Sequence, residues 1–260
     1  MIGKKKTSLL DHELLLASAR HGSQNEIEGL LALGASTSCR NGSGATPLIA
    51  SIFANNKAAF DLLLPRSIPA IRDCGGLQAV DIAALNGRDD FIEALLADGR
   101  SELSHRDMSG ARHWTPLMHA VAGGDLRCVE LLLPASSPLD ITVIGCSALS
   151  VTLSLKRDPQ AGIAKALLRA EPRLGLILGE RQEPLLFHAI RSKALLVAES
   201  LIPHSDLCLR IRRQNALEFA LEHAPSIADL IRATIEAREI DSSTRGPATS
   251  NSITSRPRTL

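Results

Sequence analysis

The feature that most constrains this chain is a short motif that recurs along most of its length. A turn is followed by Thr-Pro-Leu or a substitute, and then by a helix-forming run of small and aliphatic residues. The copies begin at Thr46, Gln78, Thr115, Ser147, Pro184 and Asn215, with spacings of 32, 37, 32, 37 and 31 residues. A seventh copy starts near Glu13, because several residues of 19–32 recur in 84–97 at a constant offset of 65. A period of this length is typical of a repeat architecture.

Each copy of the motif is followed by a second apolar cluster. The two apolar stretches are separated by Gly, Asn or Ser, which indicates two short antiparallel helices joined by a turn. Thr46-Pro47 and Thr115-Pro116 mark helix starts, because a Thr hydroxyl can cap free backbone N–H groups and Pro fits the first helical turn. The second clusters are Leu30-Leu31, residues 62–64, Leu95-Leu96, residues 131–133, Leu167-Leu168, Leu201-Ile202 and residues 231–235.

Residues 115–133 are the clearest copy, with the sequence Thr-Pro-Leu-Met-His-Ala-Val-Ala-Gly-Gly-Asp-Leu-Arg-Cys-Val-Glu-Leu-Leu-Leu. This segment resembles the ankyrin-repeat family, whose unit is about 33 residues of turn plus two helices. The resemblance covers roughly residues 8–238. It implies an all-α, ankyrin-type helical-repeat solenoid with short finger turns between helix pairs, because each pair can bury its apolar face only against its neighbours.

The resemblance also suggests a domain organisation. Residues 1–8 form an N-terminal lead, residues 9–238 form about seven repeats, and residues 239–260 form a basic tail that is rich in Ser, Thr and Pro. The repeats begin near residues 9, 41, 74, 107, 142, 179 and 210. We expect the tail to be disordered. Two insertions lengthen the unit: residues 111–114 extend a finger, and residues 156–159 extend the link between the helices of the fifth repeat.

One family feature is missing from the sequence. Members of the family often carry a His directly after Thr-Pro-Leu, where it hydrogen-bonds within and between repeats. The corresponding positions here are Ile49, Asp81, Met118, Ser150, Phe187 and Glu218. We therefore expect no ladder of histidines along the inner helices.

Composition excludes several classes of function. The formal net charge of +1 and the aromatic content of 2% argue against non-specific binding of nucleic acid, because such binding needs positive charge and stacking side chains. No apolar run approaches the roughly 18 residues of a membrane span, and the N-terminus has no signal-peptide core. The five cysteines lack a CxxC and are odd in number, which favours a reducing compartment. We expect a cytoplasmic protein, or one in the cytosol of a host cell if it is deployed as an effector.

Catalytic and cofactor motifs are also absent from the sequence. There is no phosphate-binding loop, nucleophile elbow, HExxH or dinucleotide fingerprint. The Gly-rich stretch 41–44 falls where each repeat needs its turn. The sequence therefore predicts a protein that is not an enzyme and that needs no cofactor or metal.

The densest group of polar side chains surrounds the lengthened finger and consists of His105, Arg106, Asp107, Arg112, His113, Trp114 and His119. Three interpretations are a metal or acid–base site, an exposed binding patch, and a solvated loop without a partner. The His spacings of 8 and 6 match no standard ligand pattern. Trp114 favours the binding patch, since the resemblance places this position on the outer side of the finger and Trp is enriched at interface hot spots.

Arginines recur on the other fingers. Together they could form an electropositive strip, which suits an acidic protein because the guanidinium group pairs carboxylates bidentately. His119 and His188 occupy matching places on inner helices and are interpreted as structural groups. The candidate protein-binding residues are Arg72, Arg106, Arg112, His113, Trp114, Arg181, Arg210 and Arg212.

These observations predict a monomeric, non-catalytic scaffold that binds a partner protein through its finger tips and inner helices. Nucleic acid and membranes are not expected partners. The alternative is an adaptor, or a host-targeted effector, that recruits a partner enzyme complex. A direct enzyme ranks third, because almost the whole chain is used in repeats.

Overall fold

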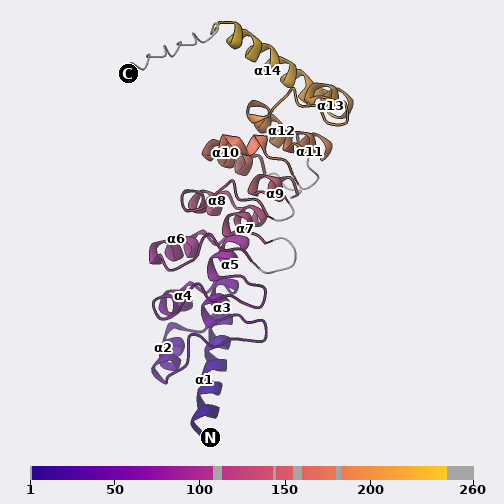
Figure 1. Cartoon of the computed structure of the whole chain (residues 1–260). Helices are drawn as coiled ribbons and strands as arrows, with labels where there is room; N and C mark the ends of the chain where they lie inside the picture. Colours follow the sequence, from indigo (N-terminus) through magenta and orange to yellow (C-terminus); the bar gives the residue numbers. More distant parts are fainter. Residues whose placement is uncertain (1, 108–112, 143–144, 155–159, 180–182, 245–260) are drawn as a thin grey trace, which may run out of the picture.

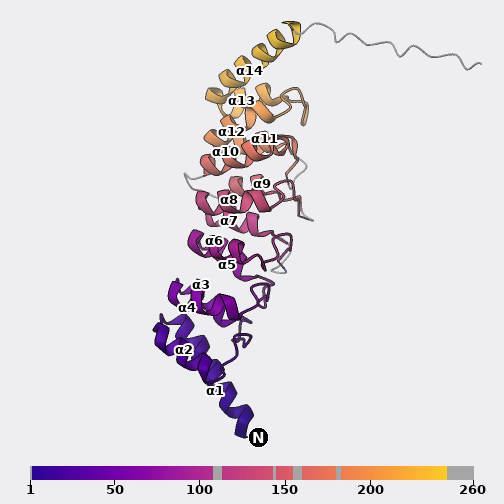
Figure 2. The ribbon, with the colours of Figure 1, turned by 90° about the vertical axis from the view of Figure 1, so that its left-hand side faces the viewer.

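The computed structural model describes residues 2–107, 113–142, 145–154, 160–179 and 183–244. In this part of the chain fourteen α-helices pack as seven consecutive pairs, and no β-strand is present. Figure 1 shows the pairs stacked into an elongated body, and Figure 2 shows the same stack from the side. The expected all-α helical-repeat solenoid is confirmed.

The helices form two columns (Figure 1). The inner column contains α1 (Ile2–Ala19), α3 (Pro47–Phe53), α5 (Ala79–Leu85), α7 (Pro116–Gly123), α9 (Ala148–Ser154), α11 (Leu185–Arg191) and α13 (Ala216–His223). The outer column contains α2 (Gln24–Ala32), α4 (Lys57–Leu63), α6 (Asp89–Asp98), α8 (Leu126–Leu132), α10 (Gln160–Ala170), α12 (Leu195–Leu201) and α14 (Pro225–Thr244). Short 3-10 helices follow four outer helices: η1 (Leu64–Arg66), η2 (Leu133–Ala135), η3 (Pro172–Leu176) and η4 (Ile202–His204). We call each pair a repeat and number the repeats one to seven.

Side-chain caps start many of these helices. The hydroxyl of Thr46 accepts from the N–H of Ile49, and that of Thr115 accepts from the N–H of Met118. Each Thr is followed by Pro at the first helical position, as the sequence predicts. In the outer column, Asn56 and Asp125 cap α4 and α8 in the same way.

The turn between the two helices of a repeat uses the left-handed backbone region. Asn55, Gly87, Gly124 and Lys193 occupy the same place in their repeats, with φ angles of 56°, 62°, 75° and 59°. Two glycines adopt this conformation without strain, whereas a residue with a Cβ is held in it at a cost. The tight turn is thus imposed by the stack even where the sequence supplies Lys.

The loops before the inner helices are the fingers, and they span residues 33–46, 67–78, 99–115, 136–147, 177–184 and 205–215. A backbone hydrogen bond closes each one. The N–H of Asn41 donates to Ala45, that of Asp73 to Leu77, and that of Asp107 to Trp114, at 3.0, 2.9 and 3.0 Å. Equivalent bonds join Thr142 to Cys146, Gly179 to Glu183 and Ile211 to Gln214. The extra residues of the fourth-repeat finger therefore lie between Asp107 and Trp114.

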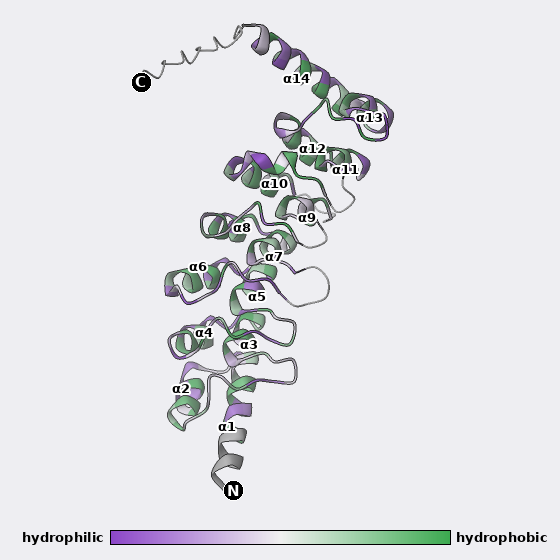
Figure 3. Cartoon of the chain, in the orientation of Figure 1, coloured by the Kyte–Doolittle hydropathy of each residue, from purple (hydrophilic) through white to green (hydrophobic). Residues whose placement is uncertain are grey.

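One continuous apolar core runs through the stack, and hydrophobic residues occur in every helix pair along its length (Figure 3). Aromatic rings join neighbouring repeats, since Phe60 and Phe91 meet edge to face with 4.7 Å between ring centroids. The inner helices α5 and α7 pack closely at Gly123. A Cβ placed there would lie 2.7 Å from the carbonyl oxygen of Ala84 and 2.8 Å from that of Leu85.

The ends of the repeat region differ from the expected boundaries. Residues 2–8 form the beginning of α1 and are not separate from the first repeat. At the other end, α14 continues to Thr244 and passes the expected boundary at 238, because no Gly or Pro interrupts the chain between Pro225 and Gly246. The remainder of the predicted tail lies outside the described residues.

Candidate protein-binding surface

Six of the eight predicted binding residues lie in the described part of the chain, and all six are on fingers. Arg72 is on the third-repeat finger, and Arg106, His113 and Trp114 are on the fourth-repeat finger. Arg210 and Arg212 are on the last finger, three repeats further along. Arg112 and Arg181 lie outside the described residues.

Consecutive fingers carry an arginine at the same position. Arg40, Arg72 and Arg106 each directly precede the residue whose N–H closes the finger. Each also reaches the next repeat: Arg40 donates to the carbonyl of Arg72 at 3.0 Å, and Arg72 donates to the carboxylate of Glu102 at 3.0 Å. Sequence reasoning missed Arg40, although its place immediately before Asn41 matches that of Arg72 before Asp73. We call these three residues the arginine row.

Acidic side chains lie beside most of these arginines. Besides the Arg72–Glu102 pair, Nη2 of Arg106 is 4.0 Å from Asp140, and Arg210 bonds Glu218 at 2.9 Å. The side chains of Arg72 and Arg106 remain 38% and 37% exposed. The surface is therefore a line of partly exposed ion pairs rather than the uninterrupted positive strip that the sequence suggested. Exposed pairs of this kind are weak, so a partner's carboxylate can compete for the guanidinium groups.

Trp114 is half-buried, which differs from the outward position expected from the sequence. Its backbone N–H donates to Oδ1 of Asp107 at 2.9 Å. Its ring meets that of His119 edge to face with 5.5 Å between ring centroids, and it packs against the core. Trp114 is thus a half-buried side chain with a structural role.

His113 lies next to Trp114 at the base of the same finger. Its φ angle is 51°, a left-handed conformation, and its Nδ1 is 3.1 Å from the carbonyl of Asp107. The guanidinium group of Arg106 reaches the carbonyl of His113 at 3.5 Å. Arg106, His113 and Trp114 are therefore held together, whereas Arg210 and Arg212 form a separate group.

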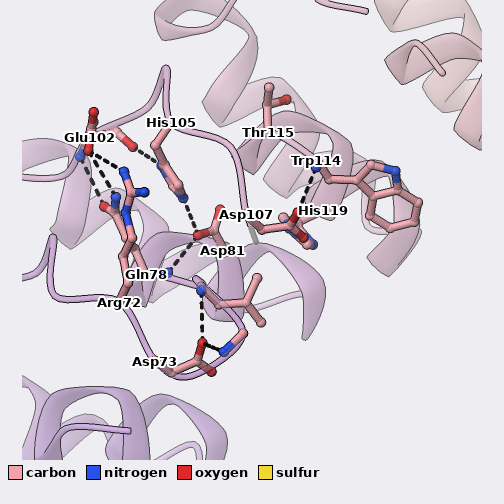
Figure 4. Close-up of polar contacts among 12 residues, drawn as sticks. Arg72, Asp73, Gln78, Asp81, Glu102, His105, Asp107, Trp114, Thr115 and His119 are labelled. Carbon is pink, nitrogen blue, oxygen red and sulfur yellow. Dashed lines mark hydrogen bonds and ion pairs between the residues drawn. The ribbon is translucent and has the colours of Figure 1, made fainter. Parts of the chain in front are cut away.

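Three members of the predicted polar cluster are buried and not part of an exposed patch. His105, Asp107 and His119 are 4%, 1% and 4% exposed. Figure 4 shows them between the third and fourth repeats, with Asp81, Gln78 and Glu102. His105 bonds Asp81 through Nε2 at 2.6 Å, and Nε2 of His119 lies 3.0 Å from Oδ2 of Asp107. Asp81 occupies the position where the family commonly has a His. In place of the contacts that this His makes in the family, Asp81 bonds His105 of the adjacent finger.

The two buried histidines have opposite pKa shifts. For His105, burial lowers the pKa, but the hydrogen bond and charge of Asp81 and the carbonyl of Glu102 outweigh it, so the pKa is raised. For His119, burial prevails over the attraction of Asp81 and Asp107, and the pKa is lowered. His105 therefore keeps its ring proton to higher pH than an ordinary histidine, and His119 loses its proton at lower pH.

A pocket of about 340 Å³ lies further along the inner column, between α9 and α11. Its wall includes a bidentate ion pair, in which Arg191 contacts the two carboxylate oxygens of Glu183 at 2.8 and 2.6 Å. The other lining residues are Ser150, Ser154, Gly179, His188 and Ser192. The lining residues come from three separate segments, which are α9, residues 179–183 and residues 188–192. No local sequence motif could therefore predict this pocket.

Two exposed apolar side chains mark the opposite half of the inner column. Phe53 and Leu85 are the last residues of α3 and α5 and are 54% and 40% exposed. The corresponding position of α11 is Arg191. At this position the inner helices therefore change from apolar side chains in α3 and α5 to a charged side chain in α11.

Within the described ranges, no three His, Cys, Asp or Glu side chains converge in a way that could hold a metal ion. In the same part of the chain, no helix combines the length and apolar character needed to cross a membrane.

The helix pairs, the bonded fingers and the continuous core define a class, the helical-repeat solenoids, in which successive units present one extended surface. Family models for ankyrin repeats match residues 14–107, as three copies, and residues 112–142. The chain is an ankyrin-repeat protein, and proteins of this family generally mediate protein–protein interaction.

Among characterised proteins, the chain is similar to the inverse autotransporter adhesin YeeJ of Escherichia coli strain K12. The two are 25% identical over 158 residues, which is 59% of this chain. The chain spans only 7% of the length of that relative.

Proposed function

We propose that this chain is a non-catalytic scaffold that binds one partner protein across its fingers and inner helices. The observation that carries the proposal is the arginine row, which places a guanidinium group at the same position on three consecutive fingers. A rigid stack sets the spacing between these groups, so little conformational entropy is lost on binding. Trp114 and His113 extend the row with a half-buried aromatic anchor, the kind of residue that dominates interface energies.

The partner that suits this surface carries acidic side chains spaced to meet successive fingers. Each arginine already contacts an acceptor in the next repeat, so the partner replaces a weak exposed contact. Such exchange gives specificity and orientation more than affinity. We further propose that the chain acts as a monomer in a reducing compartment, the cytoplasm or a host cytosol. The absence of any disulfide among its five cysteines is consistent with this.

The test is affinity capture from the source cell with three baits: the natural chain, an Arg40→Glu/Arg72→Glu variant and an Arg127→Glu control. Arg127 is an exposed arginine on outer helix α8 that pairs with Glu93 of α6, away from the fingers. All three baits should have the same circular dichroism spectrum. A partner retained by the control but lost with the finger variant supports the proposal. Equal capture by all three baits would contradict it.

A further inference from the structure

Both ring nitrogens of His105 face hydrogen-bond acceptors. Nδ1 faces the carbonyl oxygen of Glu102, and Nε2 lies 2.6 Å from Oδ2 of Asp81. The side chains of His105 and Asp81 are completely buried. A carbonyl or carboxylate oxygen can only accept, so both ring nitrogens carry hydrogen when both contacts are made. The geometry therefore requires that the His105–Asp81 pair hold one proton more than a neutral imidazole beside a carboxylate.

The two acceptors belong to neighbouring repeats. Oδ2 of Asp81 also accepts from the N–H of Gln78 at 2.7 Å, which ties it to the start of α5 in the third repeat. Glu102 belongs to the fourth-repeat finger, and its carboxylate is held by Arg72 at 3.0 Å. The protonated ring thus joins the base of the fourth-repeat finger to α5 (Figure 4).

Other charged groups around His105 define its electrostatic surroundings. Asp81 on α5 attracts the proton, Arg72 on the preceding finger opposes it, and Glu102 contributes its carbonyl. On α7, His119 shares the field of Asp81 and lies beside Asp107. Asp107 in turn accepts from the N–H of Trp114, so the same finger base is linked to α7 through His119. Two buried histidines whose pKa values are shifted in opposite directions therefore hold one finger from two sides.

We propose that the His105–Asp81 pair is a proton-dependent latch that holds the fourth-repeat finger against α5. Loss of the proton leaves one ring nitrogen without hydrogen, so either the Glu102 or the Asp81 contact is lost. It also leaves the Asp81 carboxylate buried beside a neutral ring. Raising the pH above the pKa of His105 therefore frees the finger base, and a lower pH holds it against α5. The consequence for partner binding rests on the proposed function, because Arg106, His113 and Trp114 stand on this finger.

The experiment requires no partner, so its result is independent of whether the binding proposal holds. The full chain, labelled with nitrogen-15 in histidine, is titrated by NMR from pH 5.5 to 9.5. Backbone hydrogen exchange is followed in parallel as protection factors for residues 102–107 and for Trp114. We expect the ring of His105 to remain doubly protonated above pH 6.5, the ordinary pKa of a histidine. When it loses its proton, the protection factors of the finger base should fall at least threefold more than those of α11.

Two variants distinguish the proposed latch from a general loss of hydrogen-exchange protection at high pH. His105→Gln keeps one N–H donor but cannot titrate, and it should abolish the pH dependence of finger protection. Asp81→Asn removes the charge that retains the proton, and it should move the His105 titration to lower pH. A His105 ring that is singly protonated at pH 6.5 in the natural chain would overturn the proposal. So would an unchanged loss of protection in His105→Gln. The natural-chain titration decides the question even if one variant fails to fold.

Discussion

Arg238 on α14 donates a hydrogen bond from Nη1 to the main-chain carbonyl of Ser205, the first residue of the last finger, at 3.1 Å. Its Nη2 reaches the carbonyls of Ile202 and Pro203 in the 3-10 turn η4. Arg100 makes the equivalent contacts to Ser67 and Leu64 around η1, both at 2.8 Å. In each case a guanidinium group donates to main-chain carbonyl groups at a helix end, which links successive repeats.

Replacing Arg238 with Ala should therefore lower the free energy of unfolding by about 1 kcal/mol, because charge-assisted bonds to main-chain carbonyls are lost. The matched control is Arg232→Ala on the same helix, since Arg232 makes only an exposed pair with Asp229. The control should shift the urea midpoint by much less. Equal shifts of the urea midpoint in the two variants would show that the bonds from Arg238 to these carbonyls add no stability beyond that of an exposed ion pair.

Gly123 should be intolerant of substitution because a Cβ would meet the backbone of α5. Gly123→Ala should destabilise the chain by about 2 kcal/mol, since two helices must separate to admit the methyl group. Gly29 in α2 has no heavy atom within 4 Å of the same virtual Cβ. Gly29→Ala should stabilise by about 0.5–1 kcal/mol through helix propensity. Urea denaturation of both variants checks the prediction, and a destabilised Gly29→Ala would contradict it.

Lys193 holds a left-handed conformation that costs an L-residue free energy. Lys193→Gly should raise the free energy of unfolding by about 0.5 kcal/mol, because the relieved strain exceeds the extra entropy of the unfolded chain. The reverse test is Gly124→Ala at the equivalent turn, where the added Cβ would have open space but the φ angle is 75°. That variant should lose about 1 kcal/mol. Thermal denaturation followed by circular dichroism should show a higher midpoint for Lys193→Gly and a lower one for Gly124→Ala.

Trp114→Ala should affect folding as well as binding, because the ring packs against His119 and the core. We expect a loss of about 1–2 kcal/mol in the free energy of unfolding, less than for a fully buried Trp. Exposed Arg40 offers the contrast, since Arg40→Ala should change stability little. If Trp114→Ala unfolds at the same urea concentration as the natural chain, the ring contact to His119 carries no stability.

The pH dependence of stability should show a maximum near pH 6.5. His105 has a raised pKa when folded, so the stability it contributes is present below its ordinary value of 6.5 and is lost as pH rises through the folded pKa. His119 has a lowered pKa, so the folded chain resists its protonation and stability falls as pH drops below 6.5. Urea midpoints between pH 5 and 9 measure the curve. His105→Gln should flatten the alkaline limb, and His119→Gln the acidic limb.

Much of the local architecture could be predicted from the sequence. Thr46-Pro47 and Thr115-Pro116 begin inner helices because capping involves only residues three positions apart. The lengthened fourth-repeat finger was visible as a spacing of 37 residues. Helix α14 passes the predicted boundary at 238 and reaches Thr244, since no Gly or Pro interrupts this stretch.

The candidate surface was predicted less well, for a physical reason that Arg72 and His105 illustrate. Arg72 looked like a free positive charge, but its partner Glu102 is 30 positions away and is brought close only by stacking. His105 and Trp114 looked exposed on a finger, yet His105 is buried against the third repeat and Trp114 is half-buried against α7. Their charge state and exposure depend on neighbours that no local pattern encodes.

The sequence by itself determined the repeat period, the helix pairs and their starts, because these follow from contacts between residues close along the chain. Only the tertiary structure decided which finger residues are exposed, which are paired, and which buried histidine has a raised pKa and which a lowered one. The reason is that burial and electrostatic field at each finger are set by the repeat stacked against it, about one period away in the sequence.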